Sequence, residues 1–555
     1  MNGARIFVES LKKEGVDTLF CYTGGAVISI FDELHKHGEG IQLIQPRHEQ
    51  GGTHAADGYA RSTGKPGVVL VTSGPGATNT ITGIATAYMD STPLVVVTGQ
   101  VSTDKIGTDA FQESDVTGIT LPITKANFLV KDVKDLAITI KRAFYLATTG
   151  RPGPVVIDIP GDVQKQEYKF HYPDDPQLSS YRPKEVGHPK QIKSTAKMLS
   201  KAKKPLILAG GGVNLSEAND ELNKFLNKYK IPVATTLMGH GINPDDERLF
   251  CGFVGMHGTL YANYAIQNAD LIIAIGVRFS DRITGDTSVF AKNAKIIHVD
   301  IDPAEIGKNI PVDLPIVGPA KSVLKELNAA EIKGDYTAWV EEIDEYRKKN
   351  PLVYEKTGLL KPQYLVELAS RIFPEDTIVA TDVGQNQMWV GQYYRFRHPR
   401  TFLTSGGLGT MGFGLPAAIG AAVGNPDRQV LMFSGDGGFQ MNMQELNTIR
   451  KYKLKVKMII MDNSYLGMVR QWQELLFEKR YSGTDMGDNP DFIKLAEVFD
   501  IKAVRLEKPE DAERVITELA ESDTSMLVHA AIDPDENVLP MVPAGKPLDK
   551  VITKF

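Results

Sequence analysis

The sequence has little cysteine, no excess of basic residues and no long apolar run. Only Cys21 and Cys251 occur among its 555 residues, which argues against a disulfide framework and fits a reducing compartment. Lysine and arginine total 62 against 68 aspartates and glutamates, a net charge of −6, which argues against a nucleic-acid-binding protein. No apolar stretch reaches the roughly 20 residues that span a bilayer, so we expect no membrane association.

The first fifteen residues lack the pattern of a signal peptide. Ala4, Phe7, Val8 and Leu11 recur at helical spacing, with charged residues between them. This spacing predicts the first helix of a domain. We therefore expect a cytoplasmic protein, or the mature form of an imported one.

Short apolar runs alternate with longer amphipathic stretches along the whole chain. Hydrophobic residues make up 42% and charged residues 23%, as in proteins with large buried cores. The apolar runs end at or near a glycine or a polar residue, as buried parallel strands do. They include 67–74, 93–100, 271–279, 429–434 and 456–462. The alternation predicts an α/β fold with parallel sheets and crossover helices.

Two polar, proline-containing stretches, 165–190 and 334–361, interrupt this alternation, and we interpret both as linkers. They divide the chain into three parts, about 1–165, 190–330 and 360–555. A length of 555 residues fits three or four domains of roughly 150 residues each. We therefore expect three domains, each with a doubly wound parallel sheet.

The sharpest motif lies in the last third of the chain. A Gly-Asp-Gly turn at 435–437 follows one apolar run, and Asp462-Asn463 ends the next run. Ligands bind outside the carboxyl ends of parallel strands, so Asp436 and Asn463 are expected to meet there. Their oxygens suit Mg²⁺, and the glycines would let a diphosphate approach the backbone. The alternative interpretation is a strand-end turn followed by a helix cap.

A second feature is Glu49, which precedes the predicted helix 53–62. An isolated glutamate there is most simply a surface charge favoured by the helix dipole. Combined with the three-part plan and the Gly-Asp-Gly motif, Glu49 resembles the cofactor-activating glutamate of thiamine-diphosphate-dependent enzymes. The resemblance narrows to the acetohydroxyacid synthase (acetolactate synthase) catalytic subunits. The stretches that carry it lie at 47–61, 71–79, 90–101, 109–120, 150–160, 255–265, 278–285, 404–421, 467–473 and 536–543.

This resemblance implies a thiamine-diphosphate-binding fold with an N-terminal pyrimidine-binding, a central FAD-binding-like and a C-terminal diphosphate-binding domain. It implies that pyruvate is decarboxylated and its two-carbon unit ligated to pyruvate or 2-oxobutyrate, the first common step of valine, leucine and isoleucine biosynthesis. The implied cofactors are thiamine diphosphate, Mg²⁺ and FAD, the last without net redox chemistry. A homodimer or tetramer is implied, in which different subunits hold the two ends of one cofactor. A small regulatory subunit is a further implied partner.

The resemblance also assigns roles to individual positions. The catalytic group is Glu49, Gln112, Phe111 and Gly25, and the substrate group is Arg282, Trp472, Met256 and Val469. The cofactor group is Gly409, Met411, Gln385, Asn386, Gly435, Gly437 and Gly438, and the metal group is Asp436, Asn463 and Tyr465. The FAD group is Arg151, Gly210, Gly211, Gly212, Thr236, Leu237, Met238, His257, Arg278, Asp300, Gln387 and Met388.

Several of these positions also allow plainer interpretations. Met411 and Trp472 could be core residues, and Arg282 could form a surface ion pair with Asp281. In the implied roles, Met411 props the bent cofactor, Arg282 holds the carboxylate of the second 2-oxoacid, and Trp472 shapes the acceptor pocket. Glu49 would hydrogen-bond the aminopyrimidine ring, a role that requires a site of low dielectric constant.

Five positions depart from the family pattern. Thr23, Gly161, Asn386 and Asp462 replace a proline, a lysine, a histidine and an asparagine, and 318–320, with Pro319, lacks an aspartate that contacts the flavin. These departures leave open another thiamine-diphosphate-dependent decarboxylase or carboligase with an altered acceptor. An ordinary nucleotide-binding α/β protein or an inactive paralogue is a third hypothesis, disfavoured because Glu49, Asp436 and Asn463 are all retained.

Overall fold

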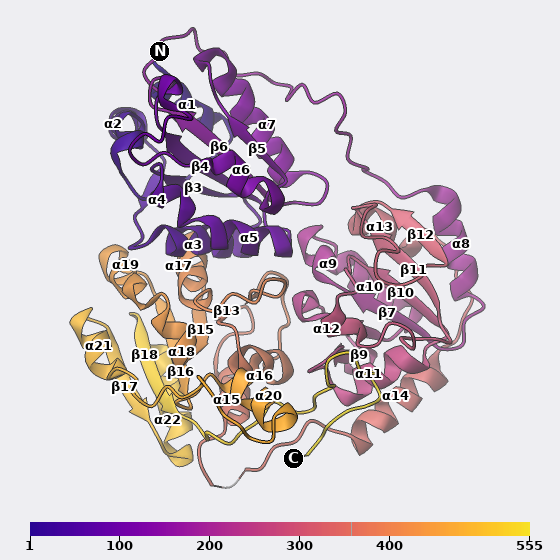
Figure 1. Cartoon of the computed structure of the whole chain (residues 1–555). Helices are drawn as coiled ribbons and strands as arrows, with labels where there is room; N and C mark the ends of the chain where they lie inside the picture. Colours follow the sequence, from indigo (N-terminus) through magenta and orange to yellow (C-terminus); the bar gives the residue numbers. More distant parts are fainter. Residues whose placement is uncertain (357, 555) are drawn as a thin grey trace.

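The computed structural model describes residues 1–356 and 358–554, which form three α/β domains (Figure 1). Each domain is built on one six-stranded parallel sheet, and each sheet lies within one of the three parts predicted from the sequence. The predicted fold of three doubly wound parallel-sheet domains is therefore confirmed.

The order of the strands differs from their order along the chain, because helical crossovers connect them. The N-terminal domain has the order β2-β1-β3-β4-β6-β5, with β1 (Thr18–Cys21), β2 (Gln42–Ile44), β3 (Gly67–Val71), β4 (Leu94–Gln100), β5 (Ala126–Leu129) and β6 (Pro154–Pro160). The central domain has the order β12-β11-β10-β7-β8-β9, with β7 (Pro205–Ala209), β8 (Val233–Thr235), β9 (Phe250–Phe253), β10 (Leu271–Ile275), β11 (Lys295–Asp300) and β12 (Leu314–Val317). The C-terminal domain has the order β14-β13-β15-β16-β18-β17, with β13 (Ile378–Thr381), β14 (Phe402–Leu403), β15 (Val430–Gly435), β16 (Val456–Asp462), β17 (Lys502–Leu506) and β18 (Met526–Ala531).

Burial on both faces explains why the strands are continuously apolar. In β4, Leu94 and Val96 belong to one buried cluster, whereas Val95 and Val97 belong to the cluster on the other face. Successive side chains of a strand point to opposite faces, so a strand between two helical layers needs apolar residues at every position. The run 271–279 forms a shorter strand than its length suggests, because the chain turns at Gly276 with a φ of +61°.

The N-terminal and C-terminal domains meet through α3 (Glu49–Thr63) and α17 (Gly414–Gly424), which lie next to each other in Figure 1. A Cβ on Gly420 would lie 1.8 Å from the carbonyl oxygen of Ala55, and one on Gly58 would lie 2.2 Å from that of Ala417. Larger side chains at these glycines would push the helices apart. The two domains of one chain are therefore packed against each other at the helix that begins with Glu49.

The two predicted linkers behave differently. Residues 165–188 contain no helix or strand, and α8 (Pro189–Leu199) begins the central domain. The interpretation of 334–361 as a linker is wrong for its middle part, which forms α14 (Thr337–Lys349). Trp339 and Ile343 of α14 are buried in the core of the central domain, while Glu341, Glu345, Lys348 and Lys349 are exposed.

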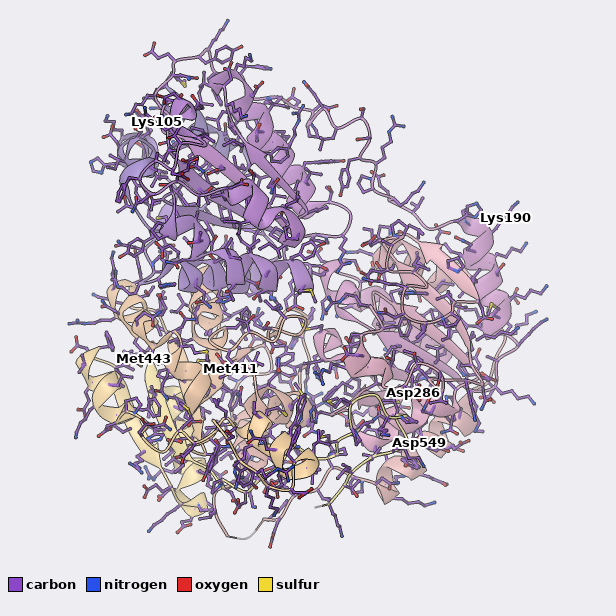
Figure 2. All side chains as sticks on the ribbon, in the orientation of Figure 1. Lys105, Lys190, Asp286, Met411, Met443 and Asp549 are labelled. Carbon is purple, nitrogen blue, oxygen red and sulfur yellow. The ribbon has the colours of Figure 1, made fainter. Side chains whose placement is uncertain are left out.

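The C-terminal segment returns from the last domain to the central domain. Val542 N–H donates to the carbonyl oxygen of Met256 at 2.7 Å, and Leu548 is buried in the central core. Figure 2 labels Asp286 and Asp549 close together at this contact, where Asp286 N–H also donates to the carbonyl oxygen of Lys546. Across the described part of the chain, no helix combines the length and the apolar character needed to cross a membrane.

Candidate active site

The predicted metal residues lie at two neighbouring strand ends of the C-terminal domain. β15 and β16 pair in parallel, so Asp436 and the Asp462-Asn463 pair leave the sheet at the same edge. Asp436 begins the short helix α18 (Asp436–Gln440) and is 1% exposed, and Asn463 is 8% exposed. The side-chain amide of Asn489 donates to Asp436 Oδ2 at 2.8 Å and to Asp462 Oδ1 at 3.2 Å. The strand-end expectation therefore places these residues correctly.

Asp436 is a buried carboxyl without a cationic partner. Burial raises its pKa to about 7, the charge of Asp462 adds to the rise, and the hydrogen bond from Asn489 opposes it. No lysine, arginine or histidine among the described residues forms an ion pair with Asp436, so a bound divalent cation would stabilise its ionised form. No cluster of three His, Cys, Asp or Glu suited to a metal occurs in the described ranges. A Mg²⁺ site here would therefore add amide or carbonyl oxygens, such as that of Asn463, and these suit the ion.

A cavity of about 70 Å³ opens beside Asp436. Its walls include the predicted cofactor and metal residues Met411, Gln385, Asn386, Gly435, Gly437, Gly438, Asn463 and Tyr465, together with Val469. The side-chain oxygen of Asn386 is buried there without a hydrogen-bond partner. Gln385 is already engaged, because it accepts from Asn463 Nδ2 at 3.1 Å and donates to Gln471 Oε1 at 3.0 Å. A polar ligand in this cavity would find Asn386 available, whereas Gln385 braces the proposed metal ligand.

Gly438, the second glycine after Asp436, leaves space for the side chain of Asp382. A Cβ on Gly438 would lie 2.3 Å from Oδ1 of Asp382, the buried residue that follows β13. Asp382 accepts backbone hydrogen bonds from Gly412 and Gly414, each at 3.0 Å. These two glycines follow Met411, which Figure 2 shows within the C-terminal domain. Asp382 thus fixes the turn that follows Met411, the residue expected to support the bent cofactor.

A larger cavity of about 1240 Å³ lies at the meeting point of the three domains and shares Met468 with the smaller one. It is lined by the predicted FAD residues Arg151, Gly211, Gly212, Thr236, Leu237, Met238, His257, Arg278, Asp300, Gln387 and Met388, and by Gly409. Gly210 does not line it; a Cβ there would lie 2.1 Å from the carbonyl oxygen of Gly276. Nδ1 of His257 is buried without a partner at this wall. This volume exceeds the ~300–1,000 Å³ typical of small-molecule sites.

Three of the predicted substrate residues meet at the wall of this larger cavity. Nη1 of Arg282 lies 3.2 Å from Sδ of Met256, and its guanidinium carbon lies 5.4 Å from the ring centre of Trp472. The Arg282 side chain is 53% exposed, and its Nε lies 3.6 Å from Asp281 Oδ2. The weak surface ion pair and the pocket position therefore coexist, and the guanidinium is accessible to an anionic ligand. The fourth residue, Val469, lines the smaller cavity instead.

The predicted catalytic residues of the N-terminal domain line neither of these two cavities. Glu49 begins α3, is half-buried, and accepts a hydrogen bond from Asn79 Nδ2 at 3.0 Å. Phe111 is 89% exposed, and the space where a Cβ of Gly25 would lie is open. Within one chain, Glu49, Gly25, Phe111 and Gln112 are thus not brought to the Asp436 site.

The loop that carries Gln112 has an unusual conformation. Gln112 has a φ of +60°, which residues other than glycine rarely adopt, and it packs against Gly74. Gln100 of β4 holds the loop to the sheet. Its amide donates to the carbonyl oxygen of Ser114 at 2.9 Å and to Asp158 Oδ2 at 2.8 Å. Burial raises the pKa of Asp158 to about 7. Gln100 thus connects the loop of Gln112 to the buried Asp158 of β6.

Sequence reasoning did not identify three polar residues of this region. Asn79, the partner of Glu49, lies in the stretch 71–79 that carries the resemblance. Asp382 follows a buried strand, so the rule that pointed to Asp436 could have found it. Asn489 had no such signal, because it lies in the irregular segment between α20 (Gly467–Leu476) and α21 (Phe492–Val498).

Comparison with known proteins agrees with this architecture. Three family models match: "Thiamine pyrophosphate enzyme, N-terminal TPP binding domain" over residues 1–119, the corresponding "central domain" over 192–327, and "C-terminal TPP binding domain" over 382–530.

Similar proteins extend over the whole chain. A protein of Methanocaldococcus jannaschii named "Probable acetolactate synthase large subunit" is 50% identical, and the match covers 100% of this chain and 95% of the relative. The "Acetolactate synthase large subunit" of Haemophilus influenzae is 46% identical, with 100% and 98% covered. The "Acetolactate synthase, chloroplastic" of Arabidopsis thaliana is 44% identical, with 100% and 84% covered. The chain therefore belongs to the acetolactate synthase large-subunit family of thiamine pyrophosphate enzymes.

Proposed function

We propose that this chain is the catalytic subunit of an acetolactate synthase. It decarboxylates pyruvate and joins the two-carbon unit to pyruvate or 2-oxobutyrate, the first common step of branched-chain amino acid biosynthesis. The observation that carries this proposal is the Arg282–Trp472 contact at a cavity that adjoins the strand ends with Asp436 and Asn463. An anion-binding group and an apolar wall thus lie beside the proposed cofactor site.

When bound, thiamine diphosphate supplies the electron sink for both steps. Asp436 and Asn463 would hold Mg²⁺ with the diphosphate, and a carboxyl oxygen of Glu49 would exchange a proton with the aminopyrimidine ring. The Arg282 guanidinium binds the carboxylate of the acceptor by charge-assisted hydrogen bonds. The Trp472 ring forms the wall that senses the extra methylene of 2-oxobutyrate.

FAD is proposed for the larger cavity, without net redox chemistry. The cavity volume and the unpartnered His257 nitrogen support this assignment. Gly318 and Ala320 line the wall where the family pattern has an acidic residue, so positions 318–320 supply no carboxylate, although Asp300 and Glu305 line the same cavity. We expect flavin to copurify with the protein and to be visible in its absorbance spectrum. Absence of the flavin bands from fully folded protein would contradict the assignment.

A homodimer or tetramer is proposed as the active form, because Glu49 and Asp436 lie in separate regions of one chain. Phe111, Ile28 and Leu121 of the N-terminal domain are 89%, 62% and 69% exposed, as expected of a surface that a second copy covers. We further propose a cytoplasmic enzyme that pairs with a smaller regulatory subunit, as the "large subunit" names of the relatives suggest.

The deciding experiment is incubation of purified protein with pyruvate, thiamine diphosphate and Mg²⁺, followed by an assay of acetolactate. Acetolactate formation, and acetohydroxybutyrate when 2-oxobutyrate is added, is the expected result. Acetaldehyde as the sole product would instead favour an enzyme with altered carboligation, and would direct attention to Gly161 and Asn386.

A further inference from the structure

Asn489 connects the two carboxylates at the proposed metal site. Its side-chain oxygen accepts a hydrogen bond from Gln440 Nε2 at 2.8 Å, so its NH₂ group is turned toward the carboxylates. That group donates to Asp436 Oδ2 at 2.8 Å and to Asp462 Oδ1 at 3.2 Å. Two like charges at one strand edge repel, and a bridging amide offsets this repulsion by donating to both.

Asp462 stands where the family pattern has asparagine, and both of its oxygens are occupied by protein donors. Oδ1 also accepts the backbone N–H of Ser464 at 2.8 Å, and Oδ2 lies 2.8 Å from Nε2 of His529. The His529 ring packs edge-on against Phe492, with the ring centres 5.1 Å apart. Asp462 is thus held as a hydrogen-bond acceptor and does not present a free oxygen to a cation.

We propose that Asn489 is a positioning residue that holds Oδ2 of Asp436 and so fixes the orientation in which this carboxylate meets a divalent cation. Gln440 and the Asp462–His529 pair fix Asn489 in turn. Asp462 therefore anchors Asn489 through a hydrogen bond and is not an additional metal ligand. This proposal rests on the proposed metal site, and it adds residues that act on the metal only through Asp436.

The test is direct metal binding, with Mn²⁺ as the probe and electron paramagnetic resonance as the readout, in the presence of saturating thiamine diphosphate. Partners of a metal ligand typically change metal affinity by roughly 10- to 100-fold, so Asn489→Ala should weaken Mn²⁺ binding by this factor. Its kcat should recover at saturating Mn²⁺, because the ligands themselves remain. Asn268→Ala, at an exposed asparagine of the central domain, is the matched control and should bind Mn²⁺ as the wild type does.

The outcomes distinguish the metal site itself from the positioning role of Asn489. Wild-type protein that binds no Mn²⁺ would overturn the metal site itself. Wild-type binding with equal or tighter binding by Asn489→Ala would overturn only the positioning role, since tighter binding would mean that a released Asp462 becomes a ligand. Gln440→Ala, which leaves both carboxylates intact, should give a smaller loss of affinity in the same direction.

A double-mutant cycle isolates the contact between Asn489 and Asp462. Asp462→Asn removes the second charge, so Asn489→Ala should weaken Mn²⁺ binding less in that background than in the wild type. If the effects of Asn489→Ala and Asp462→Asn on Mn²⁺ affinity were strictly additive, the role of Asp462 as the anchor of Asn489 would be overturned. Thermal melting of the metal-free variants shows whether each one folds, and affinities are compared among folded proteins.

Discussion

The C-terminal and N-terminal domains present their predicted active-site residues in opposite ways. Asp436 and Asn463 are buried at a strand edge, with hydrogen-bond partners from several segments of the same domain. Glu49 is half-buried and Phe111 is 89% exposed, although α3 packs tightly on α17. One chain thus builds the proposed anchor for the cofactor by itself, whereas Glu49, the group proposed for proton transfer, lines neither cavity of that chain.

The largest expected effect concerns Glu49. Glu49→Gln removes the acid–base group, and such steps contribute roughly 10²–10⁴-fold to rates, so turnover should fall by this factor. Binding of Mg²⁺ and thiamine diphosphate, measured by calorimetry, should persist because Asp436 and Asn463 are unchanged. Glu39→Gln, at an exposed carboxylate, is the control and should keep wild-type turnover. Near-normal acetolactate formation by Glu49→Gln would contradict the assigned role.

Mixing two inactive variants tests whether the site is shared between chains. Asp436→Ala should lose Mg²⁺ and cofactor together, because the diphosphate needs the metal to offset its charge. If each site combines Glu49 of one copy with Asp436 of the other, a Glu49→Gln/Asp436→Ala heterodimer retains one intact site. After full subunit exchange, activity should recover to about one quarter of wild type, since half of the dimers then carry one working site of two.

Recovery of activity in this mixture would mean that each site combines Glu49 of one copy with Asp436 of the other. No recovery, despite heterodimers detected by mass spectrometry, would mean that Glu49 and Asp436 of the same chain cooperate. Each variant alone, carried through the same exchange procedure, supplies the background.

A smaller effect is expected at Trp472, which lies in the C-terminal domain but faces the larger cavity. A pocket wall discriminates one methylene by roughly 10- to 200-fold, so Trp472→Leu should reduce the preference for 2-oxobutyrate over pyruvate by no more than this. Pyruvate decarboxylation should be largely retained. Phe477→Leu, a partly exposed aromatic residue just after α20, is the control. The readout is the ratio of acetohydroxybutyrate to acetolactate with both oxoacids present, and an unchanged ratio would rule out the pocket assignment.

Arg282→Ala separates binding of the carboxylate from recognition of the side chain. It should weaken every 2-oxoacid acceptor, because it removes a charge-assisted contact that all of them share. Loss of only one of the two acceptors would contradict this role.

The same contrast explains how much the sequence could predict. The strands and the meeting of Asp436 and Asn463 at neighbouring strand ends were predictable, because buried parallel strands need apolar residues throughout and their carboxyl ends converge. α14 was interpreted as linker because it is rich in charged residues and only a few residues, such as Trp339, reach the core.

Contacts between distant segments were not predictable. Asn489 reaches Asp436 from an irregular segment 53 residues away in sequence, so no local pattern announces it. The separation of Glu49 from the Asp436 cavity depends on how two domains pack, which hydrophobic periodicity does not encode. For Glu49, only the family resemblance indicated a role, and the proposal of a second subunit rests on the separation of Glu49 from the Asp436 cavity.

The smallest expected effect compares two buried carboxyls, Asp436 and Asp158, whose pKa values are both raised to about 7 by burial. Asp436 has a proposed cation, whereas Asp158 has only neutral donors, Thr98 Oγ1 at 2.6 Å and Gln100 Nε2 at 2.8 Å. A folded-state pKa above the ordinary 3.8 means that Asp158 contributes stability below about pH 4, and that this contribution is lost as pH rises through about 7. Asp158→Asn cannot titrate, so its melting temperature should fall less than that of the wild type across this range. Measured with saturating Mg²⁺ and thiamine diphosphate, which hold Asp436 ionised, the difference reports Asp158 alone, and parallel pH profiles would contradict it.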